Sequence, residues 1–209
     1  MFKKIPISIF YWCIIVSFCL SKQIQAEDSQ SAYANHEWNC QINVPPGWHC
    51  IEGKQIVQKI KDLGRDSHEL VEKSGVIVNI SEYPFGSKVD FNPNINISAK
   101  NIVITSQPAT ERQIVEYAKK VLLSLVPSGS ISDIQQGKVN DLISISSEYE
   151  YQLQASQGTV NISNLSTILV SKTTNNYFII IATCKKQEEE KYFPIFKTEI
   201  ASFKEIADD

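Results

Sequence analysis

The chain has 209 residues and a formal net charge of −3, with 20 basic and 23 acidic side chains. Only Arg65 and Arg112 are arginines. Nucleic-acid binding draws its affinity from clustered Lys and Arg, and base recognition favours Arg. The composition therefore argues against a protein that binds nucleic acid.

The first 26 residues carry the three-part pattern of a secretory signal peptide. Lys3 and Lys4 give a short basic start, and an apolar run follows from Ile5 to Leu20. The stretch Gln23-Ile24-Gln25-Ala26 then places a small residue where signal peptidase would cut, just before two acidic residues. We therefore expect residues 1–26 to be removed during export, and the mature protein to act in the periplasm or outside the cell.

Two other interpretations of this segment fit less well. An uncleaved membrane anchor needs about 20 predominantly apolar residues, whereas the run here is shorter and ends in Ser21-Lys22-Gln23. A lipoprotein would need a cysteine preceded by small residues, but the cysteines at positions 13 and 19 follow Trp12 and Phe18. We therefore expect no stable membrane span once the signal is cleaved.

The mature chain has the size of one domain, which we place at residues 37–209. Removal of the signal takes away three lysines and no acid, so the net charge of the remainder is −6. Residues 27–36 are polar and are predicted to form a flexible lead-in.

Cys40 and Cys50 lie symmetrically about a Pro45-Pro46-Gly47 turn, in a segment that resembles a hairpin over residues 37–51. In a hairpin their Cβ atoms would be opposite each other, about 4.5–5.5 Å apart, which a disulfide bridges with small adjustment. An oxidising compartment favours the bond. We therefore predict a Cys40–Cys50 disulfide, and a buried thiol at Cys184, which ends an apolar strand.

The segment after the hairpin predicts two short helices and two extended stretches. Helical spacing begins at residue 53 and is interrupted at Gly64, and Ser67 is a candidate cap for a second helix that Gly75 ends. Residues 76–80 then predict a strand, followed by a loop to Pro93 and an extended segment over residues 95–99.

The strongest helix begins near Thr110, because Thr110-Glu-Arg-Gln113 is a capping box. Pro127 and Gly129 end it. Its apolar residues fall on one face, so the helix is expected to lie on a core. They are Ile114, Val115, Ala118, Val121, Leu122 and Leu125.

The rest of the chain predicts an antiparallel meander and a final helix. Residues 143–154 alternate with a period of two, and two further strands follow, from Thr159 to Ser171 and from Tyr177 to Thr183. The last helix carries Phe193, Phe196, Ile200 and Phe203 at helical spacing. Helices on both sides of a mainly antiparallel sheet make a three-layer α/β/α sandwich of the α+β class.

In this order of elements the chain resembles the PsbP-like superfamily, which includes the photosystem subunit PsbP and a Mog-type Ran-binding protein. The residues that carry the resemblance are Ile42-Asn-Val-Pro-Pro-Gly-Trp48 and Phe91-Asn-Pro-Asn-Ile-Asn-Ile97. It covers residues 37–206. The resemblance implies a fold more than a function, with mostly non-catalytic members that bind a protein complex, an assembly factor or an ion. It carries over no catalytic residue and no photosystem binding.

Catalytic and metal-binding patterns are weak in this sequence. The histidines are His36, His49 and His68, and no Gly-x-Ser-x-Gly motif accompanies them. Cys184 lies in an apolar setting that does not suit a nucleophile. His36, Cys40, His49 and Cys50 match no zinc spacing, and the acidic run at residues 188–190 lacks calcium-loop chemistry. We expect neither an enzyme nor a cofactor.

Aromatic residues in loops are the more informative feature. The loop from Tyr83 to Asn96 holds Tyr83, Phe85 and Phe91, and we predict that it contacts a partner, since aromatics are enriched in interface hot spots. The candidate partner-binding residues are Tyr83, Phe85, Phe91, Asn94 and Trp38. For Trp38 and Trp48 the simpler interpretation is that both rings close one end of the sheet.

The sequence thus favours an exported, non-enzymatic protein-binding or assembly factor whose protein partner is unidentified. The alternative is a carrier of a lipid or small molecule in a pocket between sheet and helix, which an apolar cavity would support. A hydrolase comes third, and would require a cleft containing carboxyl groups of raised pKa.

Overall fold

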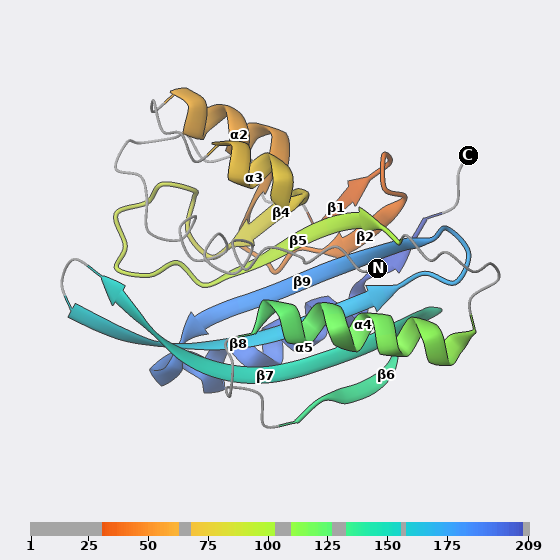
Figure 1. Ribbon diagram of the computed structural model, residues 1–209. Helices are drawn as coiled ribbons and strands as arrows, with labels where there is room; N and C mark the ends of the chain where they lie inside the picture. Colours follow the sequence, from red (N-terminus) through yellow and green to blue (C-terminus); the bar gives the residue numbers. More distant parts are fainter. Residues whose placement is uncertain (1–30, 63–67, 103–109, 127–132, 156–157, 207–209) are drawn as a thin grey trace.

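A computed structural model describes residues 31–62, 68–102, 110–126, 133–155 and 158–206 (Figure 1). The predicted signal peptide, residues 1–26, lies outside these residues. So do Ser67, the candidate helix cap, and Pro127 and Gly129, the predicted end of the long helix.

The centre of the molecule is a seven-stranded antiparallel sheet with the strand order β3-β4-β5-β9-β8-β7-β6. Its strands are β3 (His49–Glu52), β4 (Val76–Ser81), β5 (Asn94–Asn101), β6 (Gln135–Val139), β7 (Leu142–Ala155), β8 (Gly158–Val170) and β9 (Asn176–Lys185). The predicted meander is confirmed as β7-β8-β9. The sequence missed β6, because its mostly exposed residues show no apolar alternation.

Two helices cover opposite faces of this sheet (Figure 1). Helix α4 (Glu111–Leu125) packs on β7 and β8, and helix α5 (Glu189–Ser202) packs on β9 from the other side. The predicted α+β class, a three-layer sandwich with a mainly antiparallel sheet, is confirmed.

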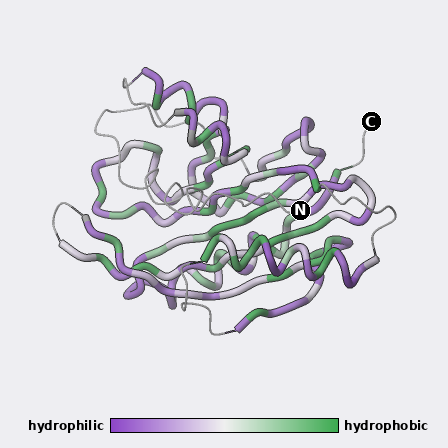
Figure 2. Tube along the Cα trace, in the orientation of Figure 1, coloured by the Kyte–Doolittle hydropathy of each residue, from purple (hydrophilic) through white to green (hydrophobic). Residues whose placement is uncertain are grey.

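Strand β9 is buried on both faces, as its unbroken apolar run predicted. Ile179 and Ile181 belong to the core cluster beneath α4, whereas Phe178 and Ile180 belong to the cluster beneath α5. Because successive side chains of a strand point to opposite faces, a single strand supplies both cores. Figure 2 shows the resulting concentration of hydrophobic residues along the central strands.

The start of α4 confirms the predicted capping box. The Thr110 hydroxyl accepts a hydrogen bond from the Gln113 amide (3.3 Å), and the Gln113 side-chain oxygen accepts one from the Thr110 amide (2.9 Å). The six apolar residues predicted to share one face of this helix are all buried.

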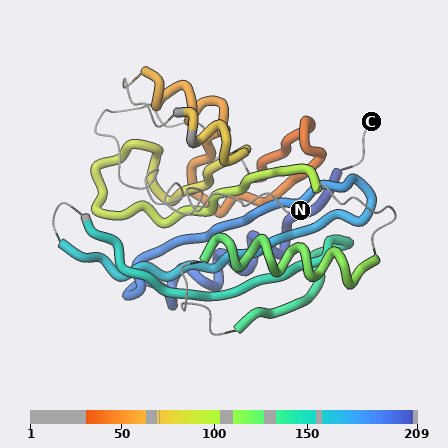
Figure 3. Tube along the Cα trace, in the orientation of Figure 1, coloured from red at the N-terminus to blue at the C-terminus, as the bar shows by residue number. Residues whose placement is uncertain are grey.

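The N-terminal segment differs from prediction. A second, three-stranded sheet joins β1 (Ala32–Asn35), β2 (Cys40–Asn43) and β10 (Lys204–Glu205). Part of the predicted flexible lead-in is therefore a strand, and the reason is Tyr33, which is buried in the same core as α5. Figure 3 shows how this sheet brings the two ends of the described chain together.

The predicted hairpin around Pro45-Pro46-Gly47 does not form. Strand β2 pairs with β1 and β10, whereas β3, which carries Cys50, pairs with β4 in the main sheet. The segment crosses between the sheets because Trp48 packs edge-on against Tyr192 and Phe196 of α5. The arrangement that predicted a Cys40–Cys50 disulfide is therefore absent, and both residues are thiols in the structure.

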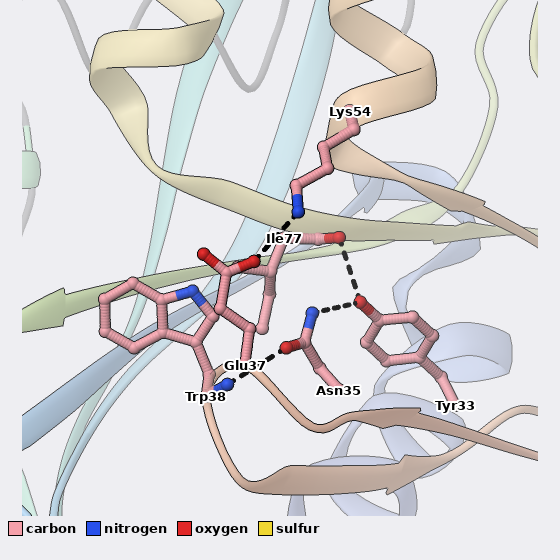
Figure 4. Close-up of polar contacts among 6 residues, drawn as sticks. All are labelled: Tyr33, Asn35, Glu37, Trp38, Lys54 and Ile77. Carbon is pink, nitrogen blue, oxygen red and sulfur yellow. Dashed lines mark hydrogen bonds and ion pairs between the residues drawn. The ribbon is translucent and has the colours of Figure 1, made fainter.

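Polar contacts fasten the small sheet to the rest of the molecule (Figure 4). The buried Tyr33 hydroxyl donates to the Ile77 carbonyl of β4 (3.1 Å) and accepts from the Asn35 amide (2.8 Å). Glu37 forms an ion pair with Lys54 (2.9 Å), which lies in α2 (Gly53–Asp62). Burial raises the pKa of Tyr33, so its hydroxyl remains a donor at neutral pH.

Two glycines allow the helical pair α2 and α3 (His68–Ser74) to approach the sheet. A Cβ at Gly53 would lie 1.8 Å from the Val76 carbonyl oxygen, so only glycine fits at the start of α2. Gly75 has a φ of +72°, which favours glycine, and it ends α3 as predicted. Ile56, Ile60 and residues of β3 and α3 form a separate small core.

Glu199 is a buried carboxyl group on α5, and it predicts a pH-dependent stability. Its Oε2 accepts no hydrogen bond within the described structure, and burial raises its pKa. The folded state therefore retains a proton that the unfolded chain releases, so this stabilisation is present at acidic pH and is lost as pH rises through the raised pKa.

We expect Glu199→Gln to increase the free energy of unfolding by about 1 kcal/mol at neutral pH, since it removes a buried charge without changing the shape. The gain should shrink towards acidic pH. Urea unfolding across this pH range measures it, with Glu190→Gln, at an exposed position on the same helix, as the control. A variant as stable as the parent protein at every pH would contradict the prediction.

Candidate functional site

The loop between β4 and β5, residues 82–93, presents one aromatic ring to solvent and buries two. Tyr83 is 40% exposed, whereas Phe85 is 7% and Phe91 4% exposed. The prediction that these three rings contact a partner therefore does not fit the two phenylalanines, which are buried. Phe85 packs with Ile51 and Ile56 in the small core under α2, so it anchors the loop to the protein.

The main chain of Tyr83 is held on both sides. The Asn92 side-chain oxygen accepts from the Tyr83 amide (3.0 Å), and the Asn92 side-chain nitrogen donates to the Tyr83 carbonyl (2.8 Å). The Ser81 hydroxyl donates to the same carbonyl (2.8 Å), and the Glu82 amide donates to the Pro93 carbonyl (3.1 Å). These bonds hold the exposed ring on a fixed backbone.

The next residues form a tight turn. The Ser87 amide donates to the Pro84 carbonyl (3.0 Å), and the Ser87 hydroxyl donates to the same oxygen (2.7 Å). Gly86 within this turn has a φ of +92°, a conformation that glycine adopts easily. The turn and the buried ring of Phe85 hold the chain in place immediately after Tyr83.

A charged group lies beside Tyr83. The Glu82 carboxylate accepts from the Tyr192 hydroxyl (2.6 Å) and from Lys191 Nζ (2.9 Å) on α5. Burial alone would raise the pKa of Glu82, but these hydrogen bonds outweigh it and hold the pKa below its ordinary value. Burial, followed by the Glu82 contact, raises the pKa of Tyr192 to about 12. The group is therefore an ionised carboxylate paired with a lysine.

The other two predicted contact residues are not exposed. Asn94 is 1% exposed, and its side chain donates to the Asn92 carbonyl (2.7 Å), so it supports the loop from inside. Trp38 is half-buried against the α5 core, and Trp48 is buried in it. Of the five residues predicted to bind a partner, Tyr83 is exposed, Trp38 is half-buried, and the other three are buried.

The sheet face that carries α4 has a strongly polar half, which the sequence analysis missed. The cross-strand partners Ser81, Asn94, Thr183, Asn164 and Tyr149 form one row across five strands. Thr183 lies two and four residues from Ile181 and Ile179, which face α4, so this row shares that face. The polar face, as named below, comprises Asn79, Ser81, Asn94, Asn96, Ser147, Tyr149, Asn164, Ser166 and Thr183.

Hydrogen bonds connect neighbouring side chains of the polar face. The Asn79 amide donates to Asn96 (2.8 Å), and the Asn96 amide donates to Asn94 (2.6 Å). Thr183 donates to Asn164 (2.6 Å), and the hydroxyls of Tyr149 and Ser166 lie 3.1 Å apart. Since buried polar groups are costly without partners, these bonds make the polar face compatible with burial.

A short repeated motif in the sequence encodes part of this face. Asn-Ile-Ser occurs at residues 79–81, 96–98 and 161–163, and Asn-Leu-Ser occurs at residues 164–166. In the copies at 79–81, 96–98 and 164–166 the asparagine and serine point to the face that carries α4, and the aliphatic residue points to the α5 core. In the copy at 161–163 the orientation is reversed, because Asn161 is exposed and the Ser163 hydroxyl donates to Glu189 of α5. The motif therefore indicates a strand with alternating polar and apolar residues but does not determine which face each residue takes.

Among the side chains that the structure describes, neither the histidines nor the cysteines converge. His36 is exposed and His49 half-buried at a sheet edge, and the described residues contain no group of three or more His, Cys, Asp or Glu side chains arranged to hold a metal. Burial raises the pKa of Cys40 and of Cys184 to about 12. Both are therefore protonated at neutral pH and are poor nucleophiles.

Comparison with known proteins identifies the fold. No protein-family model matches the chain, and no curated protein matches it. The solution structure of cyanobacterial PsbP (CyanoP) from Synechocystis sp. PCC 6803 aligns with a TM-score of 0.50 and 11% sequence identity, covering 89% of this chain and 98% of that one. This protein has a PsbP-like fold. The PsbP-like resemblance seen in the sequence is thereby confirmed at the level of the fold, which is all that 11% identity shows.

A crystal structure from Bacteroides thetaiotaomicron VPI-5482 also aligns, with a TM-score of 0.47 and 13% identity. The alignment covers 87% of this chain and 50% of that chain.

The hydrogen bonds of the polar face predict that replacing one asparagine side chain lowers the stability of the protein considerably. Asn96→Ala removes the acceptor of the buried Asn79 amide, so we expect the free energy of unfolding to fall by about 1–3 kcal/mol. Chemical unfolding measures the loss, and Asn161→Ala, an exposed site on β8, is the control. In a double-mutant cycle with Asn79→Ala the two losses should be clearly less than additive. Simple additivity would show that the bond contributes nothing.

Proposed function

We propose that this protein is an exported, non-enzymatic binding or assembly factor that acts on a protein partner in the periplasm or outside the cell. The observation that carries the proposal is Tyr83, an exposed aromatic ring on a main chain that Asn92 and Ser81 hold in place. The PsbP-like fold is compatible with this role but does not specify it.

A fixed aromatic ring is suited to recognition for an energetic reason. Ordering a loop on binding costs free energy, so a contact residue that is already held loses less. Tyrosine is also enriched among the residues that dominate binding energy. The Glu82–Lys191 ion pair beside the ring would lie at the rim of such a contact, where charges favour the correct partner more than they add affinity.

The location rests on the N-terminal sequence. Residues 1–26 carry a basic start, an apolar run and a small residue at the expected cleavage site. Within the part of the chain that the structure describes, no helix has the length and apolar character needed to cross a membrane. We infer that the mature chain is released after export and meets its partner there.

A second candidate function, carriage of a small molecule between sheet and helix, is favoured by the polar face. Amide and hydroxyl groups can donate and accept hydrogen bonds, so this face suits a polar molecule better than an acyl chain. Native mass spectrometry of the protein recovered after export tests the candidate. A bound mass that Asn164→Ala releases would support it, and the mass of the bare chain would contradict it.

The partner-binding proposal predicts a selective loss in Tyr83→Ala. Crosslinking in the exporting cells, followed by mass spectrometry, identifies proteins captured by the tagged chain in periplasm and medium. We expect Tyr83→Ala to weaken capture of the main partner about tenfold or more, with the free energy of unfolding changed by less than about 0.5 kcal/mol.

The matched control is Leu123→Ala. Leu123, on α4, is the other large apolar side chain that is exposed among the described residues, and it lies outside the 82–93 loop. Its variant should capture the partner as the parent protein does. If Tyr83→Ala captures the partner undiminished, the 82–93 loop is not the contact surface. If neither fraction yields a partner, the assembly role is wrong.

A further inference from the structure

Glu199, on α5, is a buried acid to which no positive charge of the described structure is bound. The residue is 8% exposed, and its Oε2 accepts no hydrogen bond within the described structure. Burial raises its pKa, and no neighbouring cation among the described residues lowers it again. An uncompensated charge in such a place is strongly destabilising, so the carboxyl group is suited to a cation that arrives from elsewhere.

The carboxyl group lies at the border of the α5 core, where a group from outside can reach it. On either side of Glu199, one turn away along the helix, Ile195 and Ser202 are half-buried. Tyr192, two turns before Glu199 and on the same side of the helix, is buried. Glu199 therefore lies between the buried and the exposed face of α5.

The segment that links β2 to β3 runs past this carboxyl group. At one end the Asn43 amide donates to the Ser202 hydroxyl (2.9 Å), and that hydroxyl donates to the Glu199 carbonyl (2.6 Å). At the other end the ring centroid of Trp48 lies 6.2 Å from that of Tyr192. Because Glu199 lies between Tyr192 and Ser202 along α5, the segment passes beside it.

The start of the described chain lies beside the same segment. The Val44 amide donates to the Ser31 carbonyl (3.1 Å), and β1 pairs antiparallel with β2. Traced backwards at Ser31, the direction of β1 therefore follows residues 44–48, from the end of α5 towards its start, and Glu199 lies on this path. Three hydrogen bonds and one peptide unit connect Ser31 to the main chain of Glu199, which places the two within about 12 Å.

Export would bring a positive charge to this place. Cleavage after Ala26 hydrolyses the Ala26–Glu27 peptide bond, and the added water leaves a carboxylate on Ala26 and an α-amino group on Glu27. That amino group is mainly protonated at neutral pH. Residues 27–30 separate it from Ser31, and an extended stretch of this length spans up to about 14 Å. The new amino terminus is therefore long enough in reach to meet Glu199.

We propose that the α-amino group created at Glu27 by signal cleavage binds the Glu199 carboxylate, so that removal of the signal completes the fold. The inference rests on the cleavage that is part of the proposed function. Before cleavage the carboxyl group has no cation, and after cleavage the chain supplies one. A group that binds the folded state alone stabilises it, so the mature chain is more stable than its precursor. This order suits a protein that must stay unfolded until it has crossed a membrane.

The charges near the new terminus limit how it can bind. Glu27 and Asp28 have negative side chains, which would oppose binding if they faced Glu199. The ammonium group belongs to the main chain, so it can approach Glu199 while both side chains point to water. A lysine of another protein is the alternative occupant, and experiments on the purified chain separate the two because no other protein is present.

One variant allows the terminal charge to be removed at constant chain length. In Glu27→Gln, recovered after export, the new terminus is a glutamine that glutaminyl cyclase converts to a lactam. The α-nitrogen bonds to the side-chain carbonyl carbon, and ammonia leaves. The lactam carries no charge, whereas the untreated half of the same sample keeps its ammonium group. Mass spectrometry confirms both the cleavage site and the loss of ammonia.

Chemical unfolding of the two forms gives the equilibrium constant for folding. We expect cyclisation to lower this constant about tenfold or more, because a buried carboxylate loses its cation. When Glu199→Gln is also present, cyclisation should change the constant by less than about twofold. The matched control is Glu190→Gln, at an exposed position on the same helix, which should leave the effect of cyclisation intact.

The same samples separate this proposal from a purely structural role of Glu199. The stabilisation predicted above for Glu199→Gln applies to a carboxyl group that has no cation. It should therefore appear in the cyclised chain and be absent in the chain with a free amino terminus. A role confined to packing would give the same effect in both forms.

Chemical labelling detects the contact without reference to stability. An activated ester acylates an amine in its unprotonated form, and a neighbouring carboxylate favours the protonated form. We therefore expect the α-amino group of the folded mature chain to react about tenfold more slowly than in its Glu199→Gln variant. Mass spectrometry of the N-terminal peptide measures the rate, with an exposed lysine of the same chain as the internal reference.

Three results would overturn the proposal. The first is an effect of cyclisation that is the same with and without Glu199→Gln. The second is an α-amino group that reacts equally fast in both chains. The third is an exported chain whose first residue is not Glu27. These measurements use no partner, so failure of the Glu199 contact in a chain cleaved after Ala26 would leave the partner-binding role to its own test.

Discussion

Strand β9 lies at the middle of the main sheet, and its side chains must be covered on both faces. That requirement places α4 on one side and α5 on the other. Each face of β9 carries apolar side chains that must be kept from water, and one helix covers each face. It also explains the small sheet. Strands β1 and β2 extend the layer that α5 begins, and Tyr33 is buried in the same cluster as Phe196 of α5.

The two faces of the sheet are nevertheless different. The face towards α5 is apolar along β4, β5 and β9, and the ring of Phe178 on β9 contacts that of Phe203. The face towards α4 is apolar beneath the helix and polar at the other half, where amides and hydroxyls satisfy one another. A polar face of this kind specifies its neighbours by hydrogen-bond geometry, whereas an apolar face specifies them mainly by volume.

One short segment links the polar face to the exposed loop. Asn92 holds the main chain of Tyr83, and Asn94 and Asn96 continue from it into the polar face. The Asn-Pro-Asn-Ile-Asn run therefore has two roles. Its first asparagine, Asn92, lies near the end of the loop and holds Tyr83, whereas Asn94 and Asn96 are two residues apart on β5 and keep their side chains on the polar face. Hydrogen bonds thus connect the main chain of the exposed Tyr83 to the polar face through Asn92 and Asn94.

Local patterns in the sequence were sufficient to predict the elements that are determined by nearby residues. The capping box at Thr110, the apolar face of α4, the period of two in β7 and the apolar run of β9 each depend on neighbours within a few residues. They identified the meander, the helices and the layered α+β fold. The order of these elements also identified the PsbP-like fold before any structural comparison.

Tertiary structure decided everything that depends on contacts distant in the chain. Cys40 and Cys50 are ten positions apart and resemble a hairpin, yet Trp48 packs on α5 and sends their strands into different sheets. Phe85 and Phe91 lie in a segment with the composition of an exposed loop, yet Phe85 is buried in the small core under α2 and Phe91 is 4% exposed. Tyr83, with the same local character, is exposed because Asn92 fixes its backbone from nine residues away. The sequence determined which segments form strands and helices, whereas only the packing between them determined which side chains a partner can reach.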